Sequence, residues 1–327
     1  MGLTTRKHGL ILVATACAAA LYVSQISNAG IIEGRRSPPI FPAMPDDQHD
    51  PLLEACDLSQ GLHMGHRRDV RRKYTFFTFD PTKDKQVSKA MISTGGLYDA
   101  HVHAALDVSL KALAGQGIVC NSDNVVLDVG SNLGTLALYS ASLGCPTHAF
   151  EIQPAVACRL QMSIRANALD VTLHRNAVHS VAGKTFTFPS LPSNPGGVGI
   201  SKEAFDSSAS RTVTSVRLDD LFDKLKGGVL FMKIDTEGNE FEVLKSADGL
   251  LSAHKIFNFV VEVRQHQTDM VEFVYSHGYT CALIRETIRW YTRRKPITCS
   301  GRTVAQLSAD VKGIEPHRFS DMFCCVT

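Results

Sequence analysis

The stretch LDVGSNLG, residues 127–134, decides the fold that the sequence predicts. It ends an apolar run that predicts a strand over Val125–Val129, and it opens a helix predicted over Leu133–Leu143. The next predicted strand, Thr147–Glu151, ends on an acid 17 residues after the last glycine of the stretch. A glycine turn lets the backbone approach a ligand closely, and an acid at the end of the second strand can accept both hydroxyls of a ribose. The sequence therefore predicts an α/β fold with a nucleoside-binding half.

The residues around the glycine turn indicate which nucleoside is bound. A fingerprint for the pyrophosphate of a dinucleotide requires glycine at positions 132 and 135, where this chain has Asn132 and Thr135. Asp128 places a carboxylate where it would repel a diphosphate but attract a ligand with an amino group and a sulfonium. The turn therefore favours S-adenosylmethionine as cofactor, with a nicotinamide-dependent oxidoreductase as the alternative.

A second motif, MKIDTEGNE at residues 232–240, lies where the strand predicted over Val229–Ile234 gives way to a helix. Ligands of doubly wound sheets gather at the carboxyl ends of the strands, so Asp235 and Glu237 are expected to face the same crevice as Gly130. The alternative is structural, with Asp235 capping the following helix. Two acids opposite a cofactor turn favour the functional interpretation.

Strands and helices alternate through the rest of this region, as in α/β proteins. A Gly/Ser-rich segment, Ser193–Ser210, interrupts the alternation between two β-like runs and is expected to be a functional loop or lid. The further elements predicted are strands at Val70–Phe79, Val171–Arg175 and Phe257–Val263, a helix marked by Leu106, Leu110 and Leu113, and helices at Pro154–Ala168 and Asn239–Ala247.

The charge balance bears on the partners of the protein. The chain has 34 Lys+Arg and 32 Asp+Glu, and its formal surplus of +2 equals the contribution of Arg6 and Lys7 in the first 29 residues, which hold no acid. The remaining chain is neutral, which argues against a nucleic-acid partner. With 44% hydrophobic and 20% charged residues, the chain is not expected to be disordered either.

The apolar run after Arg6 and Lys7 predicts a membrane-targeting segment. Residues 9–26 are long enough for a single-pass anchor in a thin bilayer, and Ser27-Asn28-Ala29 would equally suit cleavage of a signal peptide. A buried core helix is a third interpretation. Either targeting role places the body in the lumen or outside the cell. We expect an endoplasmic reticulum or Golgi membrane protein with a lumenal catalytic domain, and a secreted protein is the alternative.

The predicted organisation has five parts. These are a signal anchor or signal peptide at 1–29, a Pro-rich stem at 30–69, an N-terminal strand and helix element at 70–119, a catalytic domain at 120–290 and a C-terminal tail at 291–327, which disulfides could tether.

Nine cysteines suit an oxidising compartment, and eight remain when Cys17 in the apolar run is set aside. Cys145 and Cys158 lie in predicted core segments and are expected to be free thiols, whereas the disulfide candidates are Cys281, Cys299, Cys324 and Cys325. The histidine pairs His63/His66 and His101/His103 have spacings that could bind metal, but neither has a carboxylate or thiolate partner in frame. No metal site is expected.

The segments 127–134, 149–154 (AFEIQP), 175–180 (RNAVHS), 214–221 (TSVRLDDL), 232–247, 260–263 (VVEV) and 277–279 (HGY) occur in the order seen in one family. Over about residues 120–285 the chain resembles the FkbM-type S-adenosylmethionine-dependent methyltransferases. The resemblance implies a class I methyltransferase fold, a Rossmann-like seven-stranded sheet with helices on both faces and an antiparallel last hairpin. It also implies O-methylation, commonly of sugar or polyketide hydroxyls.

The resemblance also implies roles for individual residues. Glu151 would hold the ribose, and Asp235 and Glu237 would face the reaction centre. Asp219 and Asp220 are expected to cap a helix. The residues expected to hold the methionine end of the donor are Asp128, Gly130, Ser131, Asn132 and Gly134, and those beside the adenine are Asn176 and Ala177.

The working hypothesis is methyl transfer to a hydroxyl, most simply that of a glycan or small hydroxylated acceptor. Such a transfer needs a base as the new bond forms, and Asp235 is the first candidate, followed by Glu237 and Glu262. His266 is a less favoured one. The alternatives are a methyltransferase acting on a protein, lipid or small molecule, and a non-catalytic glycan-binding or scaffold protein that keeps only the fold.

Overall fold

The computed structural model describes residues 56, 58–59, 61–67, 73–189, 210–264, 267–284, 299, 301–316 and 318–326. The predicted membrane segment, most of the stem, nearly all of the predicted lid and His266 lie outside the described residues. Among the residues that are described, no helix is long and apolar enough to cross a membrane.

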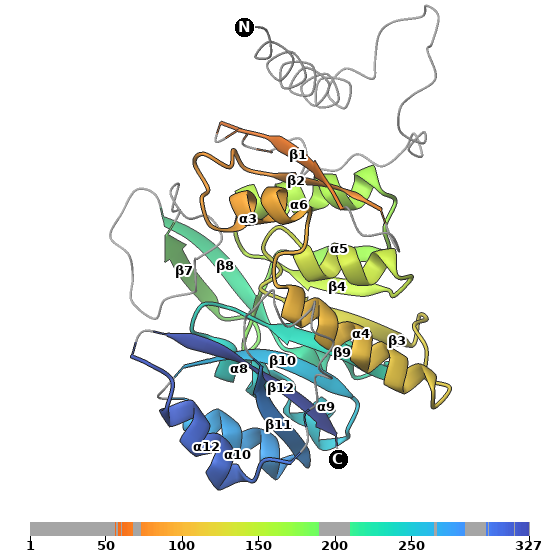
Figure 1. Cartoon of the computed structure of the whole chain (residues 1–327), viewed down its shortest axis with the longest axis vertical. Coiled ribbons are helices and arrows are strands. Elements are labelled where there is room, and N and C mark those ends of the chain that lie inside the picture. Colours follow the sequence, from red (N-terminus) through yellow and green to blue (C-terminus); the bar gives the residue numbers. More distant parts are fainter. Residues whose placement is uncertain are drawn as a thin grey trace, which may run out of the picture.

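The core of the protein is one seven-stranded sheet (Figure 1). Strand β12 runs antiparallel to both of its neighbours, whereas the pairs from β10 through to β5 are parallel. This arrangement is the class I methyltransferase sheet that the sequence predicts. In spatial order the strands are β11 (Tyr279–Ile284), β12 (Phe319–Val326), β10 (Asn258–Arg264), β9 (Gly228–Ile234), β3 (Asn124–Val129), β4 (Thr147–Phe150) and β5 (Val171–His174).

Strand β12 comes from the segment that the sequence assigns to a C-terminal tail, and it is part of the central sheet. The strand lies between β10 and β11, with Glu262 opposite Asp321 on one side and Cys281 opposite Cys324 on the other. A central strand receives its hydrogen bonds from two segments that are distant in sequence, and no local pattern in FSDMFCCV reports them.

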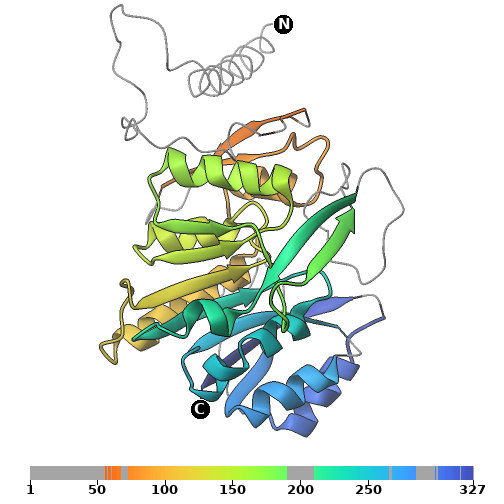
Figure 2. The same ribbon diagram turned by 180° about the vertical axis from the view of Figure 1, so that it is seen from behind.

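Helices cover both faces of the sheet, and Figures 1 and 2 show one face each. Each layer buries apolar side chains against its face, such as Leu106 and Leu136 on one side and Leu244 and Val311 on the other. The first layer is α4 (Ala100–Ala114), α5 (Thr135–Ser142) and α6 (Pro154–Ala166), and the second is α7 (Leu218–Phe222), α8 (Glu240–Ser246), α9 (Asp248–Ser252), α10 (Thr268–Ser276) and α12 (Val304–Lys312).

Two smaller units flank the sheet. The hairpin of β1 (His63–His66) and β2 (Thr75–Thr78) packs on α6, and α3 (Val87–Thr94) follows it. The second unit projects at the side of the molecule in Figures 1 and 2 and consists of β6 (Ala177–Val178), β7 (Thr185–Pro189) and β8 (Ser210–Val216). The β-like runs on both sides of the predicted lid are thus the paired strands β7 and β8.

Four disulfides join the eight cysteines that follow residue 50. The candidates Cys281, Cys299, Cys324 and Cys325 are all paired, which confirms that prediction. The sequence predicts Cys145 and Cys158 as free thiols, but they are also paired. Their partners, Cys120 and Cys56, come from segments that precede them in sequence. The pairs, with their Cα–Cα distances, are Cys56–Cys158 (5.8 Å), Cys120–Cys145 (4.8 Å), Cys281–Cys324 (4.1 Å) and Cys299–Cys325 (5.8 Å).

The Cys56–Cys158 bridge has the greatest sequence separation of the four, 102 residues, so its loss should destabilise the protein strongly. The chain-entropy account expects the double change Cys56→Ser and Cys158→Ser to lower the free energy of unfolding by about 4 kcal/mol. Equilibrium denaturation with and without a reductant measures this. The same reductant should have a smaller effect on the variant than on the unchanged protein, and a protein indifferent to reductant would contradict the prediction.

Candidate active site

A cavity of about 560 Å³ opens at the carboxyl ends of the central strands. Its walls come from the glycine turn after β3, the end of β4, the end of β9 and the segment from α3 to the start of α4. The cavity is therefore at the edge of the sheet where doubly wound folds bind their ligands. Most of the site residues expected from the sequence line it, namely Gly130, Ser131, Asn132, Glu151, Asn176, Ala177, Asp235, Glu237 and Glu262.

The glycine turn brings the two sequence motifs into contact. Gly130 has φ +78°, and a Cβ at this position would lie 1.8 Å from the backbone oxygen of Asp235. Any side chain would therefore push the two strand ends apart. Gly134 has a different role, because its missing Cβ makes room for Leu160 of α6, with which it would collide at 2.3 Å.

Glu151 is held in one orientation at the edge of the cavity. One carboxylate oxygen accepts the backbone N–H of Asn132 at 2.9 Å and the other accepts that of Gln153 at 2.7 Å. Burial raises the pKa of Glu151 to about 7, although these hydrogen bonds oppose the shift. Each oxygen keeps a lone pair, so the carboxylate remains able to accept hydroxyls of a ribose.

Asp128 does not line the cavity, contrary to its expected contact with the donor. Its Oδ2 accepts the backbone N–H of Ala137 at 2.9 Å, in the first turn of α5, while Oδ1 has no hydrogen-bond partner among the described residues. Burial raises the pKa of Asp128 to about 6, and the neighbouring Lys233 opposes the rise. Asp128 therefore stabilises the glycine turn through its hydrogen bond to α5, and Gly134 stabilises it by allowing close packing against Leu160 of α6.

Lys233 is a site residue that only a weak sequence signal indicates. It is buried, and its Nζ lies 2.9 Å from Oδ2 of Asp235. Burial alone would lower its pKa, but the carboxylates of Asp235, Asp128 and Asp99 hold the pKa of Lys233 well above its usual value. Lys233 lies on β9 and Asp235 follows the strand two positions later, and the strand period of two is the signal in the sequence.

Glu240 holds the loop of the second motif, whereas Asp235 caps no helix. One oxygen of Glu240 accepts the backbone N–H groups of Thr236 and Gly238, both at 2.9 Å. These bonds fix a turn in which Glu237 has φ +57° and Gly238 has φ +107°. The structural alternative for Asp235 is therefore wrong, and the spacing of KIDTEGNE reflects the needs of this turn.

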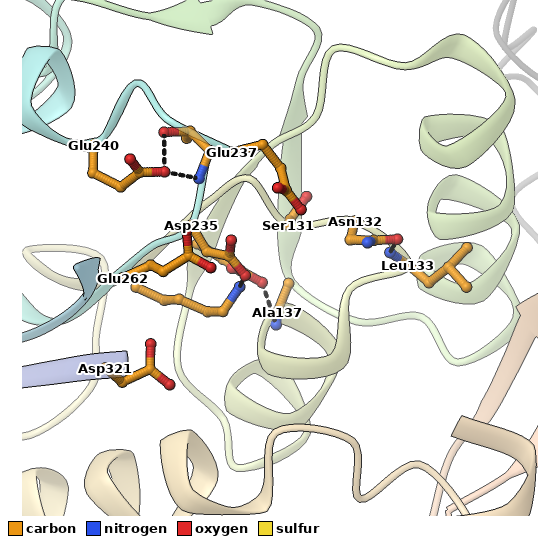
Figure 3. Close-up of polar contacts among 12 residues, drawn as sticks. Ser131, Asn132, Leu133, Ala137, Asp235, Glu237, Glu240, Glu262 and Asp321 are labelled. Carbon is orange, nitrogen blue, oxygen red and sulfur yellow. Dashed lines mark hydrogen bonds and ion pairs between the residues drawn. The ribbon is translucent and has the colours of Figure 1, made fainter. Parts of the chain in front are cut away.

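Three carboxylates form a row across neighbouring strands at the floor of the cavity (Figure 3). Asp235 follows β9, Glu262 lies on β10, and Asp321 on β12 is directly opposite Glu262. Burial, followed by the charges of Asp235 and Glu240, raises the pKa of Glu262 to about 8. Arg264 compensates part of this charge, with an Nη2 atom 3.1 Å from Glu262 and 3.7 Å from Glu237.

The sequence interpretation missed three residues of the cavity wall, Asp99, His101 and Asp321. Asp99 adopts φ 56° just before α4, and burial raises its pKa to about 7. The side chains of His101 and Asp321 contact each other across 220 positions of sequence. Only the spacing His101-x-His103 marked this region, and the second histidine is buried elsewhere, between Arg67 and the backbone of Thr135.

Two further expectations concern the edges of the site. Asn176 and Ala177 lie in the cavity wall, and the sequence predicts an adenine beside them.

Asp219 is a helix cap, as expected, but it caps α9 and not its own helix. Its two oxygens accept the backbone N–H groups of Gly249 and Leu250, both at 3.0 Å. Among the described residues no group of three or more histidines, cysteines or acids is placed to hold a metal ion.

Comparison with known families agrees with this geometry. Residues 128–286 match the family model described as methyltransferase FkbM domain. This part of the chain is an FkbM-type methyltransferase domain. The match confirms the predicted family, an enzyme of the methyltransferase class, and S-adenosylmethionine as the donor that this family uses. No curated protein matches the chain at a significant level.

Solved structures show distant similarity. The chain is 11% identical to the *T. thermophilus* 16S rRNA N2 G1207 methyltransferase, covering 81% of this chain and 51% of that one, with a TM-score of 0.41. It is 9% identical to a SAM-dependent methyltransferase from *Agrobacterium tumefaciens*, covering 80% and 69%, with a TM-score of 0.38. The chain thus spans about half the length of the first of these proteins. The class I fold stated above rests on the strand order of this chain.

The raised pKa of Glu262 predicts how the stability of the protein changes with pH. An unfolded glutamate loses its proton near its usual pKa of about 4.5, whereas the folded protein resists this loss up to about 8, so Glu262 costs stability as pH rises between these values. Glu262→Gln should therefore raise Tm by roughly 4 °C at pH 8.5 and by little at pH 5. Thermal unfolding across this range is the measurement. Exposed Glu272, changed to Gln, is the control and should show no such trend.

Proposed function

We propose that this protein transfers the methyl group of S-adenosylmethionine to a hydroxyl of a sugar or glycan in the secretory pathway. The observation that supports this best is a single cavity that joins a donor-type end, with the glycine turn and Glu151, to a row of carboxylates at the other end. The first end suits a nucleoside, and the second offers proton acceptors for a hydroxyl.

The residues present fit S-adenosylmethionine. Gly130 and Ser131 line the cavity, and Glu151 keeps the lone pairs that a ribose needs. Asp235 and Glu237 supply negative charge where the donor carries a sulfonium and an amino group. Ser131 and Asn132 would lie beside its methionine end, and Asn176 and Ala177 beside its adenine. When bound, this cofactor supplies an electrophilic methyl group.

The chain itself orients the acceptor and receives its proton. Lys233 binds Oδ2 of Asp235 and so fixes the carboxylate, which leaves Oδ1 to accept the proton of the acceptor hydroxyl. Glu262 and Glu237 flank Asp235 and are the other candidate bases, with Glu262 favoured by a pKa near the working pH. Holding oxygen, methyl carbon and sulfur in line supplies further acceleration.

The compartment is part of the proposal. Four disulfides occur in the described residues, which is typical of proteins that fold in an oxidising environment. The apolar segment 9–26 after Arg6 and Lys7 would deliver the domain to the lumen of the endoplasmic reticulum or Golgi as a single-pass protein. A lumenal domain meets glycans as its most abundant hydroxylated acceptors. The secreted form of the same protein is the alternative.

Donor binding separates the enzyme from a non-catalytic scaffold. The unchanged protein should bind S-adenosylmethionine and should not bind NAD or NADP in calorimetric titrations. Glu151→Gln should weaken donor binding by roughly 10-fold or more, because hydrogen bonds to a charged group contribute about 1.5–3 kcal/mol. Exposed Glu315, changed to Gln, should leave affinity unchanged. Absence of donor binding to the unchanged protein would favour the scaffold interpretation.

Asp235→Asn tests the proposed reaction. The variant should lose about 100-fold or more of methyl transfer, since an amide cannot accept the proton. In cells that lack the gene, the unchanged protein and the control Asp223→Asn should restore methylated glycans detected by mass spectrometry. Asp235→Asn should not restore them. Full activity of this variant would exclude Asp235 as the base.

A further inference from the structure

Two segments outside the matched domain of residues 128–286 complete the cavity. His101 comes from the first turn of α4, before the domain, and Asp321 comes from β12, after it. Both side chains are largely buried, with relative exposures of 7% and 14%, and both line the cavity. Nothing in the methyl transfer described above uses them.

His101 and Asp321 lie at one end of the carboxylate row. Ile234 pairs with Val261, and Glu262 pairs with Asp321, so the side chains of Asp235, Glu262 and Asp321 belong to one face of the sheet. Figure 3 shows these three carboxylates close to one another, and all three line the cavity. Neighbouring strands are about 4.8 Å apart, so the row extends roughly 10 Å from Asp235 to Asp321. An acceptor whose reacting oxygen lies at Asp235 therefore contacts Asp321 only if it has a second polar group roughly that far away.

The two side chains make a matched pair for a hydroxyl group. Nε2 of His101 contacts Oδ2 of Asp321, which fixes the orientation of both groups. Both side chains present polar groups at the cavity wall, and a hydroxyl can both donate and accept hydrogen bonds. Tyr98 and Asp99 form the adjoining wall, and the positive φ of Asp99 keeps the chain turned toward the cavity at this point.

We propose that the His101–Asp321 pair is an acceptor-positioning site that binds a second hydroxyl of the acceptor. This proposal rests on the proposed O-methyl transfer and adds to it the two residues that position the acceptor. A compound with one hydroxyl, such as a lipid alcohol or a serine side chain, would displace water from the His101–Asp321 pair. It would offer no second hydroxyl to replace the hydrogen bonds of that water. Sites built to bind a hydroxyl discriminate strongly against ligands that lack it.

The test uses the full-length protein, labelled S-adenosylmethionine and N-glycans released from glycoproteins of the same cells. His101→Gln and Asp321→Asn should each raise KM for the glycans about 10-fold, while kcat and donor affinity change by less than about 3-fold. The double variant should be no worse than the single ones, because the two residues act as a unit. His277 pairs with Asp248 in the same way at 3.0 Å but does not line the cavity, so His277→Gln is the matched control and should leave KM unchanged.

Binding can be followed without turnover. In the donor-free protein, the imidazole NMR signal that is lost in His101→Gln should shift when the glycans are added and should not shift with 1-propanol. An unmoved signal together with unchanged KM in both variants would overturn the proposal. So would a loss of kcat at constant KM, which would place the pair in the chemical step. If the unchanged protein methylates no glycan, the proposed function itself fails, whereas glycan methylation that both variants retain in full refutes the second-hydroxyl site alone.

Discussion

The buried ammonium group of Lys233 is the interaction on which the rest of the site depends. It lies among the carboxylates of Asp235, Asp128 and Asp99, which come from three different parts of the chain. One charge buried without partners would be very costly, and three carboxylates without the lysine would repel one another. The cluster therefore holds together only when the ends of β3 and β9 and the start of α4 are all in place. Folding of the sheet and assembly of the site are in this sense one event.

The contact between Gly130 and the backbone of Asp235 also links the fold of the sheet to the assembly of the site. Because no side chain separates them, the donor turn and the acidic motif share one wall of the cavity. Glu240 then fixes the turn that carries Glu237, and Glu151 is fixed by backbone N–H groups. Asp235, Glu151 and Glu240 are thus oriented by an ion pair or by hydrogen bonds before any ligand binds. Such preorganisation is what a group-transfer site needs, since it reduces the cost of ordering the reacting groups.

Two of the disulfides stabilise a strand that contributes a residue to the same site. Cys281–Cys324 and Cys299–Cys325 join β12 to its surroundings, and β12 carries Asp321 into the cavity. Cys56–Cys158 ties the start of the described chain to α6. The segments before and after the family domain are therefore part of the folded body. They contribute Asp99, His101 and Asp321 to the wall of the cavity.

Much of this could be predicted from the sequence. The strands at 124–129, 147–150 and 228–234, the glycine turn, Glu151 and the acids of KIDTEGNE all follow from patterns that are local, because period, glycine placement and strand-end acids act within a few residues. Local patterns could not predict that Asp128 and Gly134 contact the helices α5 and α6 behind the turn and not the cavity. They also could not predict that Cys145 and Cys158 form disulfides. Nor could they predict that FSDMFCCV is a central strand and that His101 meets Asp321. Each of these depends on a partner between 9 and 220 positions away, and only the packing of the sheet brings such partners together.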